Sequence, residues 1–342
     1  MLLSVSLAFV VTVVLTGLMR RYALASQLLD IPNARSSHTV GTPRGGGLAM
    51  VVSFALVLVA QVPLGGLEQR LVTAVLPAAL LVAAVGFLDD HADVSVRGRI
   101  LVHFAAVAWA IYWLGGTALI PLPQGLLAFG WPGRLVAVLA LVWFLNLFNF
   151  MDGIDGIAAT EAAFVAFGGA WLAVMSGLHD LAFALFVLGA AALGFLAWNW
   201  YPAKIFMGDV GSGFLGAALG IFGYAAVVAD GALLWPWLIL VGVFVTDASI
   251  TLVRRFLRGE RWYEAHRSHA YQWAARRWGH LRVTSGVLLI NLAWLLPMAL
   301  LAVTLPQVGL LIAIAAYAPV VVLAFWLGAG VAEPADRQRD RR

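Results

Sequence analysis

The sequence predicts an all-α, polytopic integral membrane protein. Of its 342 residues, 63% are hydrophobic and only 11% are charged, whereas a soluble domain is about a quarter charged. The hydrophobic residues also fall in runs of about 18 or more, the length that a helix needs to cross the apolar core of a bilayer. The chain has no cysteine, which excludes disulfides and thiolate metal sites. We expect one transmembrane domain over residues 1–342.

Eleven hydrophobic segments are candidate membrane-spanning helices. The first lacks a basic start and a small-residue cleavage site, so we interpret it as a spanning helix and not as a signal peptide. An odd number of spans places the two termini on opposite sides of the membrane. The predicted helices are about 3–20, 47–63, 70–88, 100–116, 134–150, 157–175, 181–199, 213–229, 232–253, 284–304 and 308–330.

The basic residues predict the orientation of these helices. Of the 21 lysines and arginines, all except Arg70 and Arg134 fall on one predicted side, and such an excess marks the cytoplasmic side. We therefore expect an external N-terminus and a cytoplasmic C-terminus. The net charge of +4 belongs to this topology and to anionic lipid headgroups, so no nucleic-acid partner is predicted. The predicted cytoplasmic segments are 21–46, 89–99, 151–156, 200–212, 254–283 and 331–342.

Acidic residues gather on the same side, beginning with "FLDDHADVSVRGR" at 87–99. Asp89 and Asp90 end the third predicted span, where adjacent like charges beside an apolar slab repel unless a cation or metal compensates. Arg97 and Arg99 follow within one loop. The alternative interpretation is a solvated helix end with surface ion pairs.

The segment "NLFNFMDGIDG" at 146–156 ends the fifth predicted span. Asn146, Asn149 and Asp152 are three residues apart, so on a helix they lie along one face. Gly153 lets the backbone turn sharply and lets a ligand come close, and Asp155 follows in a second Asp-Gly pair. A helix cap with a tight turn is the alternative, but two in-phase asparagines exceed what a cap needs.

The segment "NWYPAKIFMGDVGSGFLG" at 199–216 links the seventh and eighth predicted spans. Its glycine-rich turn holds Asp209 and enters a helix, where free backbone N–H groups can bind phosphate oxygens. Lys204 adds a mobile positive charge. We predict a phosphate and metal site here, with a plain interhelical turn as the alternative.

The longest predicted inner loop, 254–280, is rich in arginine and histidine. A surface-lying amphipathic helix near 262–278 would account for Arg276. In "HRSH", however, His266, Arg267 and His269 can present several N–H donors to a pyrophosphate. Two histidines without cysteine are too few to argue for a zinc site.

The loop at 30–47 is the last basic element on this side. It carries Arg35, His38 and Arg44 before a triple glycine that opens the second predicted span. Arg35 and His38 are candidate substrate-binding residues. A solvated loop beside the membrane is the alternative.

Together these motifs resemble the polyprenyl-phosphate N-acetylhexosamine-1-phosphate transferases. That family includes phospho-MurNAc-pentapeptide translocase, an enterobacterial GlcNAc-1-phosphate initiator and a eukaryotic dolichol-phosphate counterpart. The segments that carry the resemblance stand in the family's order, and the resemblance extends over nearly the whole chain. They are "DDHAD" at 89–93, "NLFNFMDGIDG" at 146–156, "NWYPAKIFMGDVGSG" at 199–213 and "HRSH" at 266–269.

The resemblance implies transfer of a sugar 1-phosphate from a UDP-N-acetyl sugar to undecaprenyl phosphate, with release of UMP, in a bacterial inner membrane with a periplasmic N-terminus. It implies a Mg²⁺ cofactor, with Mn²⁺ as the substitute, and leaves a homodimer open as the assembly. Residues are assigned by position. Asn149 and Asp209 resemble the metal ligands; Asp152, Asp155 and Asn199 the nucleotide site; Asp89, Asp90 and Asp209 the catalytic residues; and Arg99, His266, Arg267 and His269 the phosphate-binding residues. Lys204 is a further candidate substrate-binding residue, because of its charge.

The departures from the family's patterns bear on the sugar. The translocase has lysine where Asp93 stands and three histidines where "HRSH" stands, and the GlcNAc-type enzyme ends that motif with two histidines. "HRSHAYQ" is more similar to O-antigen initiators that use UDP-FucNAc or UDP-QuiNAc, so we expect one of these sugars or GlcNAc.

Two other classes of protein share part of this pattern. A secondary transporter would place its carboxylates near the midplane of the bilayer, often in repeated halves, and the sequence shows neither feature. A CDP-alcohol phosphotransferase shares Asp-x-x-Asp-Gly-x-x-Ala with residues 152–159. It then requires arginine, where this chain has Thr160.

Overall fold

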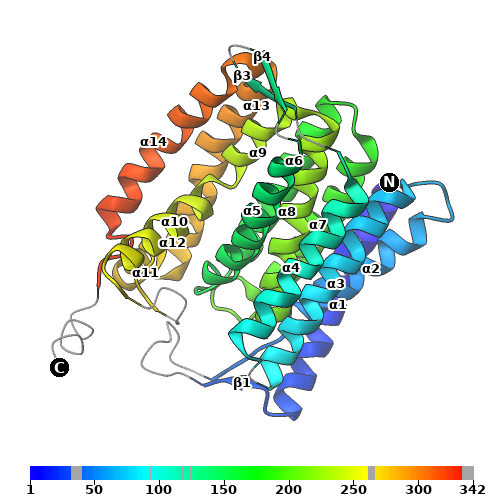
Figure 1. Cartoon of the computed structure of the whole chain (residues 1–342). Coiled ribbons are helices and arrows are strands. Elements are labelled where there is room, and N and C mark those ends of the chain that lie inside the picture. Colours follow the sequence, from blue (N-terminus) through cyan, green and yellow to red (C-terminus); the bar gives the residue numbers. More distant parts are fainter. Residues whose placement is uncertain are drawn as a thin grey trace.

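Long helices arranged side by side make up most of the computed structural model (Figure 1). The structure describes residues 1–31, 41–92, 94–116, 119–122, 125–128, 130–260 and 266–332. The helices are α1 (Leu2–Ala25), α2 (Leu48–Gln61), α3 (Gln69–His91), α4 (Val96–Leu114), α5 (Gly130–Phe150), α6 (Ile157–Met175), α7 (His179–Asn199), α8 (Asp209–Ala229), α9 (Leu234–Leu240), α10 (Gly242–Leu257), α11 (Ala270–Trp278), α12 (His280–Ile290), α13 (Leu296–Thr304) and α14 (Gly309–Leu327).

Two short antiparallel strand pairs are the exceptions to the all-α prediction within the described ranges. Strands β1 (Leu29–Asp30) and β2 (Thr42–Pro43) pair with each other, as do β3 (Leu119–Leu122) and β4 (Gly125–Ala128). The first pair closes the base of the predicted 30–47 loop. It thereby brings Asp30 and Arg44 to one wall of the cavity described below.

Each of the eleven predicted spans is helical, but the count of eleven is not confirmed. Among the described residues, eight helices are long and apolar enough to cross a membrane, or nine if α9 and α10 form one bent span. Helix α2 has only 14 residues and would reach about 21 Å at 1.5 Å per residue, against roughly 30 Å of bilayer core. Helix α4 carries Arg97, Arg99 and His103 in its first turns, which lowers its mean hydropathy.

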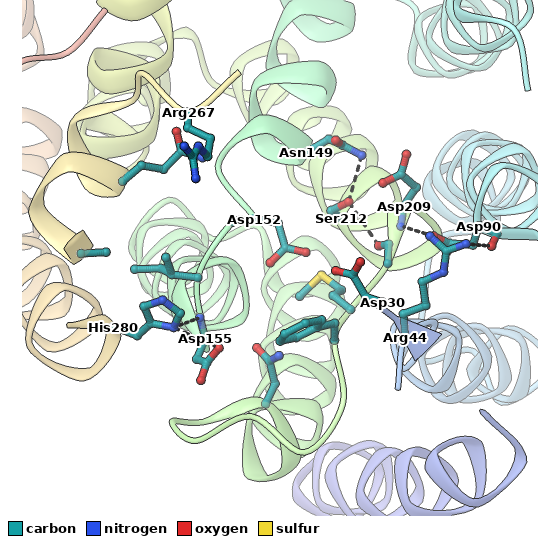
Figure 2. A pocket seen from close by; sticks show the side chains of 18 of the residues that line it. Asp30, Arg44, Asp90, Asn149, Asp152, Asp155, Asp209, Ser212, Arg267 and His280 are labelled. Carbon is teal, nitrogen blue, oxygen red and sulfur yellow. Dashed lines mark hydrogen bonds and ion pairs between the residues drawn. The ribbon is translucent and has the colours of Figure 1, made fainter. Parts of the chain in front are cut away.

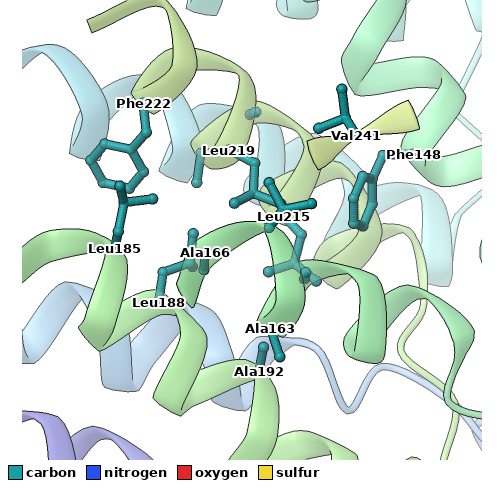
Figure 3. Close-up of a cluster of buried hydrophobic side chains, with 14 of the residues drawn as sticks. Phe148, Ala163, Ala166, Leu185, Leu188, Ala192, Leu215, Leu219, Phe222 and Val241 are labelled. Carbon is teal, nitrogen blue, oxygen red and sulfur yellow. The ribbon is translucent and has the colours of Figure 1, made fainter. Parts of the chain in front are cut away.

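The core lies between α6, α7 and α8, which are the most buried spans (Figure 3). Ala163 and Ala166 of α6 let α7 approach closely, because small side chains allow helix backbones to pack in a membrane. Leu215 and Leu219 of α8 fill the adjoining space, one helical turn apart. By contrast, α1, α5 and α14 bury only a minority of their residues, as expected for helices that face lipid.

Two spans are irregular. Helices α9 and α10 meet at Val241 with a bend of 72°. Helices α12 and α13 continue through a π-helical turn at Asn291–Leu295. The Nδ2 of Asn291 donates to the buried Oε2 of Glu161 on α6 at 2.6 Å, which ties this turn to the core.

The polar segments predicted on one side of the membrane gather at one end of the bundle. Strand β1 and helix α11 lie at that end, whereas the N-terminus and the β3–β4 pair lie at the other (Figure 1). Loops that are far apart in the sequence therefore meet around a single site.

Candidate active site

A cavity of about 500 Å³ opens at the polar end of the bundle. Its walls come from the ends of α3, α5 and α7, the start of α8, the loop before α8, helix α11 and the start of α12. Asp30 and Arg44, at the ends of the β1–β2 pair, complete it. Figure 2 shows these side chains converging on one space.

Asp90 holds the N-terminus of α8 against α3. Its Oδ1 accepts a hydrogen bond from the N–H of Asp209 at 3.1 Å, and its Oδ2 accepts one from the N–H of Val210 at 3.2 Å. The first N–H groups of a helix lack intrahelical partners and carry partial positive charge, so a carboxylate there is stabilising. Gly208 and Gly86 permit the contact, because a Cβ at Gly208 would lie 2.5 Å from Asp90 Oδ2 and one at Gly86 2.4 Å from the Asp209 carbonyl oxygen.

Arg99 links the motif that carries Asp89 to the motif that carries Asp209, on the outer side of the contact between α3 and α8. One of its Nη atoms forms ion pairs with Asp89 and, at 2.9 Å, with Oδ2 of Asp209. Asp89 also accepts from the N–H of Val94 at 2.8 Å. Asp89 and Arg99 do not line the cavity. Arg99, which is paired with Asp89, fixes the Asp209 carboxylate from outside the cavity.

Asn149, Ser212, Asp152 and Asp209 face the middle of the cavity (Figure 2). The Nδ2 of Asn149 donates to Ser212 Oγ at 3.1 Å, which leaves the amide oxygen as a potential ligand atom. No hydrogen bond or ion pair joins the Asp152 carboxylate to any part of the chain that the structure describes. Burial, together with the neighbouring carboxylates Asp209, Asp90 and Asp155, raises the pKa of Asp152 to about 7.

Asp155 and His280 form the far end of the cavity. The Nδ1 of His280 lies 3.1 Å from Oδ1 of Asp155, whose Oδ2 accepts from the N–H of Ala203 at 3.0 Å. Asn199 supports this end from within, since its Oδ1 accepts from the N–H of Gly156 and its Nδ2 donates to the carbonyl of Ile205, each at 3.0 Å.

Helix α11 forms the wall opposite the carboxylates. Arg267, just before it, and Gln272, Ala275 and Arg276 within it line the cavity. The guanidinium of Arg276 lies 4.0 Å from the centre of the Trp273 ring, in a cation–π contact, and one Nη donates to the carbonyl of Arg267 at 3.0 Å. This wall supplies most of the cavity's positive charge.

The oxygen donors of the cavity suit a small, hard divalent cation. In the described part of the chain, the lining includes five aspartates but only three arginines and one histidine, so an anionic ligand requires added positive charge. No group of three or more acidic, histidine or cysteine side chains is arranged to enclose a metal there. Mg²⁺ does not need such a group, because it usually takes one or two carboxylates and completes its shell with water and substrate phosphates.

Comparison with known proteins shows the family of the chain. A model of glycosyl transferase family 4 matches residues 72–227. A probable undecaprenyl-phosphate N-acetylglucosaminyl 1-phosphate transferase of Bacillus subtilis is 30% identical over 286 residues, covering 79% of this chain and 77% of that protein. The chain belongs to glycosyl transferase family 4. The family resemblance drawn from the motifs is thus confirmed.

Other relatives of this family 4 transferase carry different names. A decaprenyl-phosphate N-acetylglucosaminephosphotransferase of Mycolicibacterium smegmatis is 32% identical over 292 residues, covering 74% of this chain and 70% of that protein. A phospho-N-acetylmuramoyl-pentapeptide-transferase of Desulforamulus reducens is 31% identical over 277 residues, with 74% and 80% covered.

The structure separates the predicted site residues of the family 4 transferase. Those that line the cavity are Asp90, Asn149, Asp152, Asp155, Asn199, Asp209 and Arg267. Arg99 contacts Asp209 from outside the cavity, and Asp89 pairs with Arg99. Arg35 and His38, and Asp93 with them, lie outside the described residues.

His266, His269 and Lys204 are not placed where the pyrophosphate prediction requires. His269 is 2% exposed and caps α11. Burial, with His269 and Arg255 nearby, lowers the pKa of His266 to about 3, so this imidazole is uncharged near neutral pH. Lys204 is exposed and lies over the ring of Trp198, 5.6 Å from its centre. None of the three lines the cavity.

The predicted phosphate cradle at the start of α8 is also corrected. The N–H groups of Asp209 and Val210 are bound to Asp90, and those of Gly211 and Ser212 are bound to the carbonyl of Gly208 at 3.0 and 3.1 Å. The helix therefore offers the cavity the Asp209 side chain and not free backbone donors.

The sequence did not assign several cavity residues to the site, among them Asp30, Gln272 and His280. Asp30 opens the 30–47 segment and His280 ends the 254–280 segment, but neither of them is assigned to the site from the sequence. Arg276 was assigned to the membrane surface because its helix is amphipathic, yet it lines the cavity. In the sequence, His280 could have been recognised by its place directly after Gly279, where a new helix begins.

Proposed function

We propose that this protein transfers a hexosamine 1-phosphate from a UDP-linked donor to a polyprenyl phosphate and releases UMP. The observation that carries the proposal is the cavity at the end of the membrane bundle, where Asn149, Asp152 and Asp209 face Arg267 and Arg276. A water-soluble nucleotide and a lipid phosphate can both reach such a place. The names of the relatives refer to the same class of transfer.

The proposed cofactor is Mg²⁺, with Mn²⁺ as the substitute. Asp209 and the amide oxygen of Asn149 would hold it, and substrate phosphates would complete its shell. When bound, it supplies positive charge that offsets the repulsion between the two anionic substrates. Arg99 already engages Oδ2 of Asp209, so it orients this carboxylate with the other oxygen toward the cavity.

The proposed reaction is a direct phosphoryl transfer. An oxygen of the lipid phosphate forms a bond to the β-phosphorus of the UDP-sugar, and the bond from that phosphorus to the bridging oxygen breaks. UMP leaves with the electron pair, and the product is a polyprenyl diphosphate sugar. A phosphate monoester has a second pKa of about 6, so the acceptor is largely a dianion and requires little help from a base.

The residues of the cavity divide this work between them. Arg267 and Arg276 bind the donor diphosphate, since guanidinium groups suit phosphate oxygens. Asp152 and Asp155, with His280 fixed against Asp155, hold the nucleoside end. Asp90 positions Asp209, because its two oxygens accept hydrogen bonds from the first N–H groups of α8.

We further propose the finer assignments that the sequence predicts. The acceptor is undecaprenyl phosphate, and the donor sugar is a FucNAc or QuiNAc type or GlcNAc. The membrane is the bacterial inner membrane, with the cavity on the cytoplasmic side, and the product initiates O-antigen or a related surface polysaccharide. Transfer of phospho-MurNAc-pentapeptide is the second candidate, because a relative with that name is 31% identical.

The deciding experiment is a panel assay of the purified protein in detergent. UDP-GlcNAc, UDP-FucNAc, UDP-QuiNAc and UDP-MurNAc-pentapeptide are each mixed with undecaprenyl phosphate and Mg²⁺, and UMP is measured. We expect UMP only when a donor, the acceptor and the metal are all present. A stoichiometric burst of UMP without acceptor would replace the direct mechanism with a covalent intermediate. Transport of donor into proteoliposomes without UMP would overturn the proposed function.

A further inference from the structure

We infer that Asp247 is a positioning residue for the donor-binding wall, although it lies outside the cavity. It belongs to α10, the second half of the bent pair, and its exposed fraction is 4%. The inference rests on the proposed function only where it assigns α11 to the donor. The anchoring of α11 itself can be tested without substrate.

The carboxylate of Asp247 captures the first two backbone donors of α11. Its Oδ1 accepts from the N–H of Ala270 and its Oδ2 from the N–H of Tyr271, both at 2.8 Å. These donors lack intrahelical partners, and negative charge is favourable at a helix N-terminus. Oδ1 also accepts from the hydroxyl of Thr251 at 3.1 Å and lies 3.3 Å from Nδ1 of His269.

The anchor matters because α11 is short. It has nine residues, and isolated helices below about 12–15 residues are marginal in water. A buried carboxylate is costly unless it is hydrogen-bonded, and here both oxygens are bonded to α11. The position of α11 therefore depends on this contact with a bundle helix.

The positions of two parts of the cavity depend on the anchored helix α11. The first is the wall itself, with Gln272 and Arg276. The second is the turn that carries Asp152. The hydroxyl of Tyr271 donates to the carbonyl of Phe150 at 3.1 Å, and a Cβ at Gly153 would lie 2.1 Å from that hydroxyl. Through Tyr271, Asp247 positions the turn as well as the arginines.

The test compares Asp247→Asn with Thr251→Val. Asp247→Asn keeps the size of the side chain but removes its charge. It also replaces one acceptor oxygen with an amide N–H₂ donor, which faces a backbone N–H of α11. The second removes a hydroxyl bonded to the same carboxylate and leaves the contacts to α11 unchanged. Amide hydrogen exchange over residues 270–278 is measured without substrate, and KM is measured separately for donor and acceptor.

For Asp247→Asn we expect faster exchange over 270–278 and a donor KM raised about tenfold, the effect of one charge-assisted hydrogen bond. The acceptor KM should stay within about twofold, and Thr251→Val should match wild type in each measurement. Unchanged exchange over 270–278 in Asp247→Asn would overturn the anchor. Equal rises in both KM values would overturn the donor assignment.

Tyr271→Phe gives a second test that does not remove a buried charge. It keeps the ring but loses the bond to Phe150, so we expect normal exchange over 270–278 and a donor KM raised about threefold. If Asp247→Asn does not fold, a Tyr271→Phe donor KM equal to wild type contradicts the inference. If wild type releases no UMP from any donor, the proposed function fails, while the exchange measurement still decides the anchor.

Discussion

Asp90 and Asp247 perform the same local task at two places in the molecule. Each projects from a bundle helix, each is buried, and each accepts two backbone N–H groups at the start of another helix. The captured helices differ. Helix α8 is a buried span that begins with Asp209, whereas α11 is a short surface helix that carries Arg276. The role of a capping carboxylate therefore depends on the side chain that the captured helix presents.

The largest effect should come from the side chain that α8 presents. Asp209→Asn keeps the α8 backbone bonded to Asp90 but removes the charge that faces the proposed cation. We expect UMP release to fall by about 10³-fold or more, since charge neutralisation dominates this type of transfer. Asp180→Asn, which makes the same change in the first turn of α7, is the control. An Asp209→Asn rate within about tenfold of wild type would contradict the assignment.

The second effect tests the cap at α8. Asp90→Asn loses one good acceptor and shifts Asp209, so we expect kcat to fall by about 10–100-fold, as for residues that orient a metal ligand. The thermal midpoint should also fall, because a helix cap is lost. The dependence of kcat on pH between 6 and 9 distinguishes this role from a general base. If Asp90 only positions Asp209, the pH profile of kcat keeps its shape in Asp90→Asn. If the acidic limb of the profile disappears in this variant, Asp90 acts as a general base.

The third effect concerns the side chain that α11 presents. Arg276→Ala should raise the donor KM by about tenfold, the loss of one charge-assisted hydrogen bond, and change kcat little. Arg277→Ala is the matched control, because Arg277 lies over the ring of Trp278 and does not line the cavity. The two variants lose the same charge on the same helix. Equal effects on the donor KM would mean that general electrostatic attraction, and not the α11 wall, binds the donor.

The smallest effect should come from Asp152, the carboxylate without a partner among the described residues. Its pKa is raised to about 7, so the folded protein binds a proton more tightly than the unfolded chain does. This contribution to stability is present at low pH and is lost as the pH rises through about 7. Asp152→Asn should therefore raise the thermal midpoint by a few degrees at pH 8 and hardly at all near pH 4, with EDTA present. An equal shift at both pH values would rule out the charge as the cause.

The fold was largely predictable because membrane helices follow from local composition. The predicted span at 157–175 coincides with α6, and 181–199 falls within α7. The count of spans was less predictable. The sequence does not reveal that α2 ends after 14 residues or that 232–253 bends by 72°, because helix length and bending depend on neighbouring helices.

The site was predictable in its motifs and less so in its members. Asn149, Asp152 and Asp209 could be chosen because polar groups at the edge of a hydrophobic segment are rare and costly. His269 was misjudged because nothing near it in the sequence shows that it caps α11. Arg276 was misjudged because an amphipathic helix can face a cavity as well as a lipid surface.

The sequence by itself determined the class of the protein, its helical segments and the gathering of polar motifs on one side. Hydropathy and charge act locally and along the chain, so they can be read from it. Only the tertiary structure decided which carboxylates are free to act. Asp90 meets Asp209 across 119 positions, and Asp247 meets Tyr271 across 24. Backbone hydrogen bonds fix a carboxylate in one position, and folding brings together the partners that donate them.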